Sequence, residues 1–127
     1  MTERLQVYKC EICGNIVLVM HGGRGQLFCC GQPMRLMEEK MEESGYEKHL
    51  PVVEVAEGGV SIKVGSTPHP MDEGHHIEWI EAETELRTLI RFLNPGEKPE
   101  AKFKTDEKVL RVRAYCNLHG LWMREMT

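Results

Sequence analysis

The stretch "VLRVRAYCNLHGLW", residues 109–122, decides the fold, because it carries the alternation typical of a β-strand and then runs into a turn. Every second residue from Leu110 to Cys116 is apolar or small, whereas Arg111 and Arg113 lie between them. Successive side chains of a strand point to opposite faces, so this pattern predicts a strand with one apolar face. The strand ends beside a cysteine.

Other parts of the chain alternate in the same way. One such stretch is "VSIKV", residues 60–64, and another is "LRTLIRFL", residues 86–93. The second places Leu86, Thr88, Ile90 and Phe92 on one face and Arg87, Leu89, Arg91 and Leu93 on the other. Turn residues in "EGG" and "NPGEKP" separate these runs, and no stretch makes a convincing helix. Short strands at this spacing predict an all-β chain with an antiparallel β-sandwich.

The first 37 residues form a segment of a different kind. "LQVYK" and "NIVLVM" are rich in β-forming residues, and "CEICG" and "CCGQPM" supply turn residues together with cysteines. A unit this small falls below the roughly 40 residues under which a metal, disulfides or a partner is usually needed. Its four cysteines meet that need: Cys10, Cys13, Cys29 and Cys30.

The cysteines favour metal binding over disulfides. Their number is odd, at five, and the start "MTERLQVYKC" has no apolar signal segment, so we expect a cytoplasmic protein. Two pairs of thiolates suit one tetrahedral ion, and either zinc or iron accepts such ligands. The adjacent pair Cys29 and Cys30 is unusual for a zinc ribbon, whose second half is normally a spaced pair. We therefore expect a distorted site, which suits redox chemistry at least as well as a structural role.

Composition divides the chain and excludes two classes of partner. Residues 38–46 are charged and read as a linker, which separates a module over 1–37 from a sandwich domain over 47–127. A formal charge of −4 and the lack of any basic block argue against nucleic acid. No apolar run approaches 18 residues, so we expect no membrane span. An anionic substrate would need a local cation to overcome the overall charge.

Four of the six histidines and Cys116 lie where a sandwich carries its sites, at strand ends and in loops. These four histidines are His49, His69, His75 and His119. His21 lies in a predicted hairpin and is expected to be a surface residue. His75 opens the predicted strand "HHIEWI", and His76 points away from it if the strand is regular, so at most one of the two reaches a shared ion.

Three motifs in this region resemble the superoxide reductases: "EKHLPVVE" at 47–54, "HPMDEGHHIEWIE" at 69–81 and "YCNLHG" at 115–120. With "CEICG" and "CCGQPM" in front of them, the resemblance is to the two-iron branch of that family, the desulfoferrodoxins. It extends from Val7 to about Trp122. Leu50, where valine is expected, and Met123, where a basic residue is common, depart from the family pattern.

The resemblance implies a desulforedoxin-like iron module followed by an immunoglobulin-like β-sandwich, with two irons per chain. The first iron would be held by the four early cysteines. The second would be five-coordinate, with four equatorial histidines and one axial cysteine thiolate. Carried over by motif position, those ligands are His49, His69, His75, His119 and Cys116. Spacing from "HPM" favours His75 over His76.

The activity that the resemblance implies is the one-electron reduction of superoxide to hydrogen peroxide. A thiolate is a strong electron donor, and an axial cysteine in haem enzymes pushes electron density onto the iron in the same way. Lys48 would supply the local cation that attracts superoxide, and Glu47 would bind the ferric ion after turnover. A rubredoxin-like protein would re-reduce the iron, and the family forms homodimers.

Three other functions compete with this one. The chain could be an electron carrier whose working centre is the four-cysteine iron, with a structural second metal. It could be a superoxide dismutase, although strong thiolate donation disfavours oxidation of superoxide. A nucleic-acid-binding zinc ribbon is the weakest alternative, for want of a basic face or an aromatic platform. An open coordination position separates the reductase from the carrier.

Overall fold

The structure, a computed structural model, describes residues 1–43 and 48–126. Within these residues it has strands and no helix, and so none that is long and apolar enough to cross a bilayer. The chain divides into two compact units, Met1–Glu38 and Glu39–Thr127, which we call the cysteine unit and the sandwich unit. The all-β prediction is confirmed.

The cysteine unit is built from very short strands. Its three-stranded antiparallel sheet has the order β2 (Ile16–Leu18), β1 (Val7–Lys9) and β5 (Arg35–Leu36). A second, two-stranded antiparallel sheet is a hairpin of β3 (Phe28–Cys29) and β4 (Gln32–Pro33). Only four of its apolar or thiol side chains are buried: Val7, Cys10, Val19 and Met37. So small a core supports the expectation that this unit depends on its cysteines.

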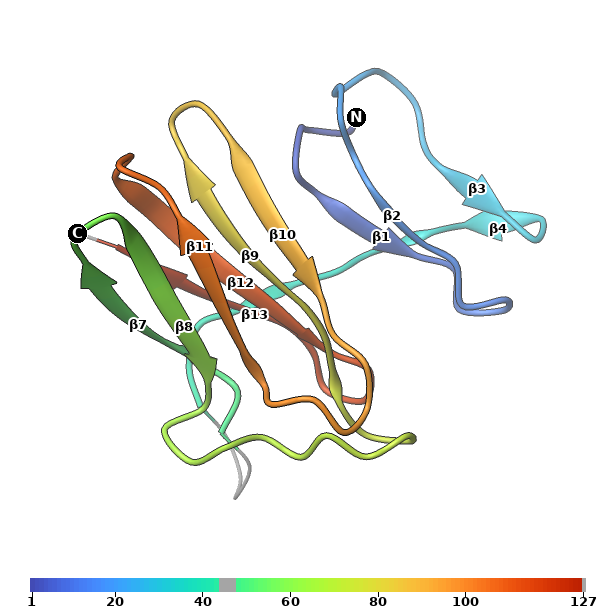
Figure 1. The fold of residues 1–127 in the computed structure, drawn as a ribbon. Coiled ribbons are helices and arrows are strands. Elements are labelled where there is room, and N and C mark those ends of the chain that lie inside the picture. The colour runs from blue at the N-terminus through green and yellow to red at the C-terminus, as the bar shows by residue number, and fades with distance from the viewer. Residues whose placement is uncertain (44–47, 127) are drawn as a thin grey trace. The chain divides into compact units, whose positions relative to one another are not determined.

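The sandwich unit stacks two sheets (Figure 1). The larger sheet has the order β10 (Thr88–Phe92), β9 (Ile77–Thr84), β12 (Val109–Cys116), β13 (Gly120–Glu125) and β6 (Glu39–Lys40). The smaller has the order β11 (Glu100–Lys104), β8 (Gly59–Val64) and β7 (Pro51–Ala56). This is the sandwich that the alternating stretches predict.

The core lies between the sheets and comes from alternate residues. β12 contributes Val112, Ala114 and Cys116, all fully buried, on the face that the sequence pattern predicts. β8 contributes Val60, Ile62 and Val64 from the opposite sheet. Full burial of an aliphatic side chain of this size contributes about 1.5–3 kcal/mol. Cys116 is therefore a core residue as well as a candidate ligand.

The other face of β12 carries a buried ion pair. Arg113 is only 4% exposed, and its Nη2 lies 2.8 Å from Oε2 of Glu81 on β9. The indole N–H of Trp79 donates to Oε1 of the same carboxylate at 2.8 Å. Alternation predicts that Arg113 opposes the apolar face, but it does not reveal that the arginine is buried, because its partner lies 32 residues away in the sequence.

The alternating stretch 86–93 forms an edge strand, β10. Leu86 and Phe92 are largely exposed, whereas Leu93 is buried and Leu89 packs against the core. The face of Leu89 and Leu93 is thus the inner one. Arg91 lies on the same face of the strand, but its side chain is partly exposed and pairs with Glu97.

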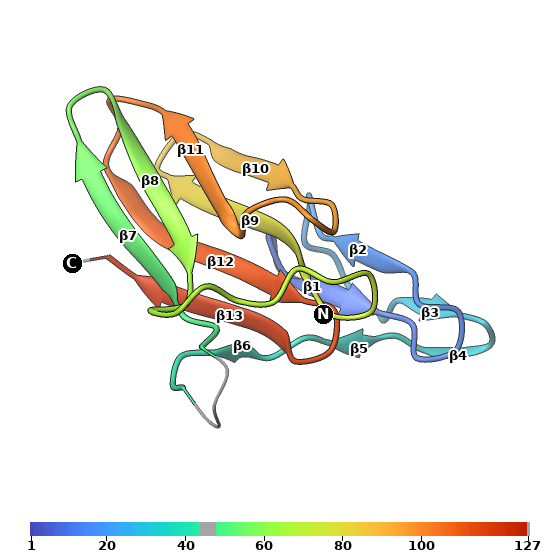
Figure 2. The same cartoon turned by 60° about the horizontal axis from the view of Figure 1, so that its bottom comes forward.

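Part of the predicted linker belongs to the sandwich. Glu39 and Lys40 form β6, which pairs with β13 opposite Leu121 and Trp122 (Figure 2). This is the parallel pair in a unit whose other strand pairs are antiparallel in the described residues. Charged composition alone does not distinguish such an edge strand from a linker.

Candidate metal centres

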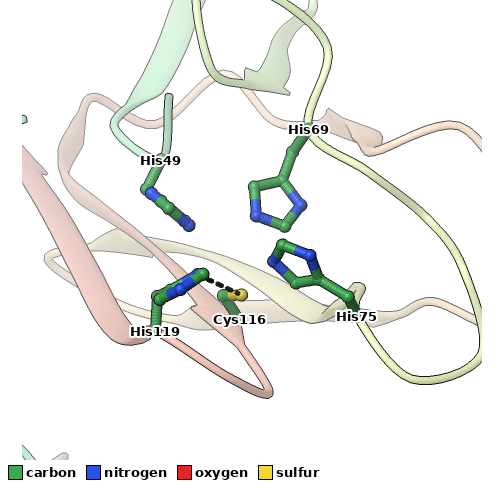
Figure 3. A group of neighbouring side chains, drawn as sticks. All are labelled: His49, His69, His75, Cys116 and His119. Atoms are coloured by element: carbon green, nitrogen blue, oxygen red, sulfur yellow. Dashed lines mark hydrogen bonds between the residues drawn. The ribbon is translucent and has the colours of Figure 1, made fainter. Parts of the chain in front are cut away.

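Five side chains of the sandwich unit converge at one end of the sandwich (Figure 3). Each offers one ligand atom, and these atoms all lie within 4.8 Å of one another. We call this set the five-residue cluster: His49, His69, His75, Cys116 and His119. Its members come from the segment before β7, the β8–β9 connection, the end of β12 and the β12–β13 turn. They are the five residues that the resemblance implies.

The four imidazoles form a closed ring. Neighbouring centroids lie 4.6 Å apart for His49 and His69, 4.9 Å for His69 and His75, and 5.0 Å for His75 and His119. His119 and His49 close the ring at 5.0 Å. Sγ of Cys116 lies 3.7 Å from Nδ1 of His119. Near-equal spacing of four imidazoles with one adjacent sulfur is an arrangement that a single metal ion can bridge.

The end of β8 positions two of these histidines. The N–H of Gly65 donates to the carbonyl of Leu50, the residue after His49, at 3.1 Å. The N–H of His69 donates to the carbonyl of Val64 at 3.3 Å. Gly65 has a φ of +85°, and a Cβ there would lie 2.5 Å from the carbonyl oxygens of both Lys48 and Thr67. The two histidine-bearing segments therefore meet around a residue that has no room for a side chain.

His49 is fixed through both its backbone and its ring. Its N–H donates to the Glu43 carboxylate, with 2.8 Å to Oε1, and the N–H of Leu50 donates to Oε2 at 3.3 Å. Its imidazole stacks on the Trp122 ring, with centroids 4.5 Å apart and planes 10° from parallel. Stacking against a large rigid ring restricts the imidazole to one plane.

Asn117 joins the two turns that carry the remaining ligands. Its Oδ1 accepts from the N–H of His76 at 2.8 Å, and its Nδ2 donates to the carbonyl of Gly74 at 3.0 Å. Its own N–H donates to the carbonyl of His76 at 3.1 Å. Asn117 lies directly after Cys116, so these bonds tie the turn of Cys116 to the segment of His75.

The cluster is buried on one side and open on the other. His49 and His69 are each 3% exposed and Cys116 is fully buried, whereas His119 is exposed. Nδ1 of His69 lies 2.8 Å from the carbonyl oxygen of Pro70, which only accepts, so the ring proton sits on Nδ1 and the lone pair on Nε2. Imidazole nitrogens together with one thiolate suit iron, so the donor set fits the implied metal.

The sulfurs of the cysteine unit also converge. The ligand atoms of Cys10, Cys13, Cys29 and Cys30, the four-cysteine cluster, lie within 4.8 Å of one another. Sγ of Cys13 is 3.5 Å from Sγ of Cys29, which is 3.9 Å from Sγ of Cys30. Cys30 has a φ of +53°, in the left-handed region that disfavours side chains. The adjacent cysteines of this cluster thus include one in a strained backbone conformation.

The protonation of these thiols indicates a need for a cation. The backbone N–H of Cys13 donates to the sulfur of Cys10 and lowers the pKa of Cys10 to about 6. The neighbouring sulfurs of Cys13 and Cys10 raise the pKa of Cys30 to about 12. The pKa of Cys30 is raised because a second thiolate beside the first is repelled, and a bound metal cation would remove this repulsion. The cluster therefore fits a metal ion.

Comparison with known proteins covers nearly the whole chain. The family model described as "Desulfoferrodoxin, N-terminal domain" matches residues 2–37, and the model described as "Desulfoferrodoxin" matches residues 41–125. The chain belongs to the desulfoferrodoxin family. A desulfoferrodoxin from Syntrophotalea carbinolica is 53% identical over 125 residues, which cover 98% of this chain and 99% of that protein.

Two solved structures resemble this desulfoferrodoxin chain. The superoxide reductase from Treponema pallidum is 30% identical, with a TM-score of 0.82, over 96% of this chain and 98% of that chain. The superoxide reductase (1Fe-SOR) from Giardia intestinalis is 34% identical, with a TM-score of 0.54, over 64% of this chain and 98% of that chain. The cysteine unit is too short for the Giardia match, so most of that match falls in the sandwich unit.

The remaining predicted site residues have different outcomes. Glu47 lies outside the described residues. Lys48 is half-buried beside His49, and its backbone carbonyl faces Gly65. His75 precedes β9 by two residues instead of opening the strand, and it pairs with Asp72 in an isolated bridge. His21 is exposed and belongs to neither described cluster, as predicted.

Several residues of the site escaped the sequence analysis. Glu43, Asn117 and Trp122 position ligands, yet each has an ordinary local context, namely a charged linker, a turn and a strand. The one available signal was proximity to the ligand motifs, since Asn117 lies inside "YCNLHG". Glu43 gave no signal, because nothing in the residues around it indicates which backbone N–H groups it would bind.

Proposed function

We propose that this desulfoferrodoxin is a superoxide reductase, which converts superoxide, one electron and two protons into hydrogen peroxide. The observation that carries the proposal is the five-residue cluster, a ring of four imidazoles with an adjacent thiol, exposed on one side. The similarity to the Treponema pallidum superoxide reductase over nearly the whole length of both chains supports it.

The two clusters would hold two irons per chain. Cys10, Cys13, Cys29 and Cys30 are the proposed ligands of the first. His49, His69, His75, His119 and Cys116 are the proposed ligands of the second. Iron held there in its ferrous form would supply the single electron that superoxide takes up.

The chain's own residues prepare this site for an anion. Cys116 presents its sulfur from the end of the sandwich core, where a thiolate is dehydrated and donates strongly. The exposed side near His119 gives superoxide and water access to the cluster. Lys48, beside His49, is the proposed local cation, which a chain of net charge −4 needs to attract superoxide. Glu47 is proposed as the carboxylate that would bind the oxidised iron.

The surroundings of the reaction follow from the family resemblance and are proposals as well. A rubredoxin-like protein is the proposed electron donor, the proposed assembly is a homodimer, and the proposed location is the cytoplasm. Size-exclusion chromatography with light scattering tests the dimer directly. Reduction kinetics with purified rubredoxin test the donor.

An electron carrier that works through the four-cysteine cluster is the second candidate. The Giardia protein argues against it, because a protein described as a one-iron superoxide reductase matches mostly the sandwich unit. A superoxide dismutase would release oxygen from part of the superoxide it consumes. Oxygen release therefore separates dismutase from reductase.

The test measures iron per chain, the visible spectrum, and the products of superoxide consumption. We expect about two irons, a thiolate-to-iron band on oxidation, and one peroxide per superoxide without oxygen release. Cys116→Ala should abolish the activity and the part of the thiolate-to-iron absorption that comes from the sandwich iron, while the four-cysteine iron stays bound and keeps its own absorption. His21→Ala, at an exposed histidine, is the matched control and should behave as wild type. Undiminished turnover in Cys116→Ala would contradict the proposal.

A further inference from the structure

The short strand β6 brings a lysine to the five-residue cluster from outside the family motifs. β6 pairs with β13 at the edge of the larger sheet and immediately follows the cysteine unit in sequence. A pairing of two residues is weak on its own, so side chains must hold this strand. Glu39 holds β6 against the larger sheet, because its carboxylate lies 3.3 Å from Nη1 of Arg113 on β12.

Lys40 also holds β6 in place, through a contact with the segment that carries a proposed metal ligand. Its Nζ donates to the carbonyl oxygen of His119 at 2.8 Å, across 79 residues of sequence. The indole N–H of Trp122 donates to the same oxygen at 3.2 Å. Two donors on one carbonyl, one of them charged, hold the backbone of His119 in place, because charge-assisted bonds are about twice as strong as neutral ones.

The same ammonium also contacts the ring that supports His49. Nζ of Lys40 lies 5.3 Å from the centroid of the Trp122 ring, within the range of a cation–π interaction. The imidazole of His49 stacks on that ring. Lys40 thus acts on His119 through its backbone and on His49 through Trp122, which are neighbours in the ring of imidazoles.

The turn between Cys116 and β13 is shaped to accept the lysine. Gly120 ends the turn with a φ of +88°, and a Cβ there would lie 3.7 Å from Nζ of Lys40. That separation is ordinary contact, so the ammonium packs directly against the turn. Lys40 is half-buried, so its side chain packs against the protein and does not extend freely into solvent.

We propose that Lys40 is a positioning residue of the five-residue cluster, which clamps His119 and, through Trp122, His49. The inference rests on the proposed function for the identity of the metal, but the clamp itself is a property of the polypeptide. It assigns a role in the site to a residue of the predicted linker that belongs to the sandwich unit. The residue need not touch substrate.

The test compares Lys40→Met with Lys102→Met in the full iron-loaded chain. Lys102 lies exposed on β11, so its substitution controls for loss of a charge. In Lys40→Met we expect the backbone amides of residues 117–120 to exchange hydrogen about tenfold faster, since a bond to a charged group is lost. We also expect a chelator to remove the sandwich iron about tenfold faster. The thiolate-to-iron band of the sandwich iron should shift. Iron of the four-cysteine cluster should leave at the wild-type rate.

Lys40→Arg should return most of the protection, because arginine keeps the charge, a donor and the preference for an aromatic face. Wild-type exchange and iron release in Lys40→Met would overturn the inference. Equal acceleration across the whole sandwich unit would also overturn it, because it would indicate general destabilisation. A wild-type chain without iron in the five-residue cluster would instead refute the proposed function, while the exchange measurement would still report on the clamp.

Discussion

Asn117 illustrates how one side chain can organise a metal site without being a ligand. Its amide bridges the N–H of His76 and the carbonyl of Gly74. Each bond is worth about 1 kcal/mol net. Their value for the site is geometric, since they fix the distance between the segments of His75 and Cys116.

We therefore expect Asn117→Ala to lower the free energy of unfolding of the sandwich unit by about 2 kcal/mol. Iron should also leave the five-residue cluster faster, because the two turns can move apart. Urea titration and chelator kinetics measure the two effects. Asn94→Ala, at an exposed turn residue, is the control. Equal iron release from Asn117→Ala and wild type would show that the turns do not need this bridge.

At this scale the sequence predicts the members of the five-residue cluster but not their supports. The ligand types are chemically distinctive, and their motifs are recognisable over a few residues. Lys40 and Glu43 are ordinary charged residues, and their roles depend on a carbonyl 79 residues away and on backbone N–H groups beyond the linker. Only the folded chain reveals such contacts.

Among the strands, β9 and β12 share a buried ion pair. Arg113 and Glu81 have side chains only 5% and 4% exposed. Removing one partner of such a pair leaves the other charge buried, which costs about 3–5 kcal/mol. We expect Arg113→Met to destabilise the sandwich unit by this amount in urea titration. The double variant Arg113→Met with Glu81→Leu should recover part of the loss, and failure to recover any would mean that the arginine acts through packing alone.

A second polar contact joins the β9–β10 turn to the segment before β12. The hydroxyl of Thr84 donates to Glu107, and Arg87 pairs with the same carboxylate at 2.9 Å. These contacts lower the pKa of Glu107 below its ordinary value of 4.5. A carboxylate with a depressed pKa stabilises the fold above its ordinary pKa, and this contribution is lost as the pH falls through the folded-state value.

Glu107→Gln should therefore lower the unfolding temperature at pH 7 relative to wild type. The difference should shrink as the pH falls below about 4 and vanish once the wild-type carboxyl is protonated. Thermal unfolding from pH 7 to 2.5 measures it, with Glu57→Gln in the β7–β8 turn as the control. A constant difference at all pH values would mean that charge is not the cause.

The strands themselves follow from sequence where alternation reflects one buried face. β8 and β12 are examples, since their apolar residues face the core as predicted. β6 is the counterexample, because two charged residues at a sheet edge need no apolar pattern. The burial of Arg113 was equally hidden, because alternation identifies a face but not what covers it.

At the scale of the whole molecule, each of the two units carries one of the two candidate metal sites. The cysteine unit has a small core and depends on its sulfurs, whereas the sandwich unit has its own core and the complete five-residue cluster.

Cys10→Ser should release the four-cysteine iron and unfold the cysteine unit. We expect superoxide reduction at the second site to stay within about twofold, by the mechanism proposed above, with wild-type reaction rates as the reference. Loss of that activity would favour the electron-carrier alternative.

Gly65 has a consequence for how such a chain can change over generations. Two histidine-bearing segments close around it, and a Cβ would meet two backbone oxygens at 2.5 Å. Every single-nucleotide change of a glycine codon that substitutes another amino acid adds a Cβ, so no conservative step leads away from this position. A saturation library at codon 65, selected for growth under superoxide stress, should return glycine alone. The ligands can be recognised by their chemistry, but this position would be recognised only by its failure to vary.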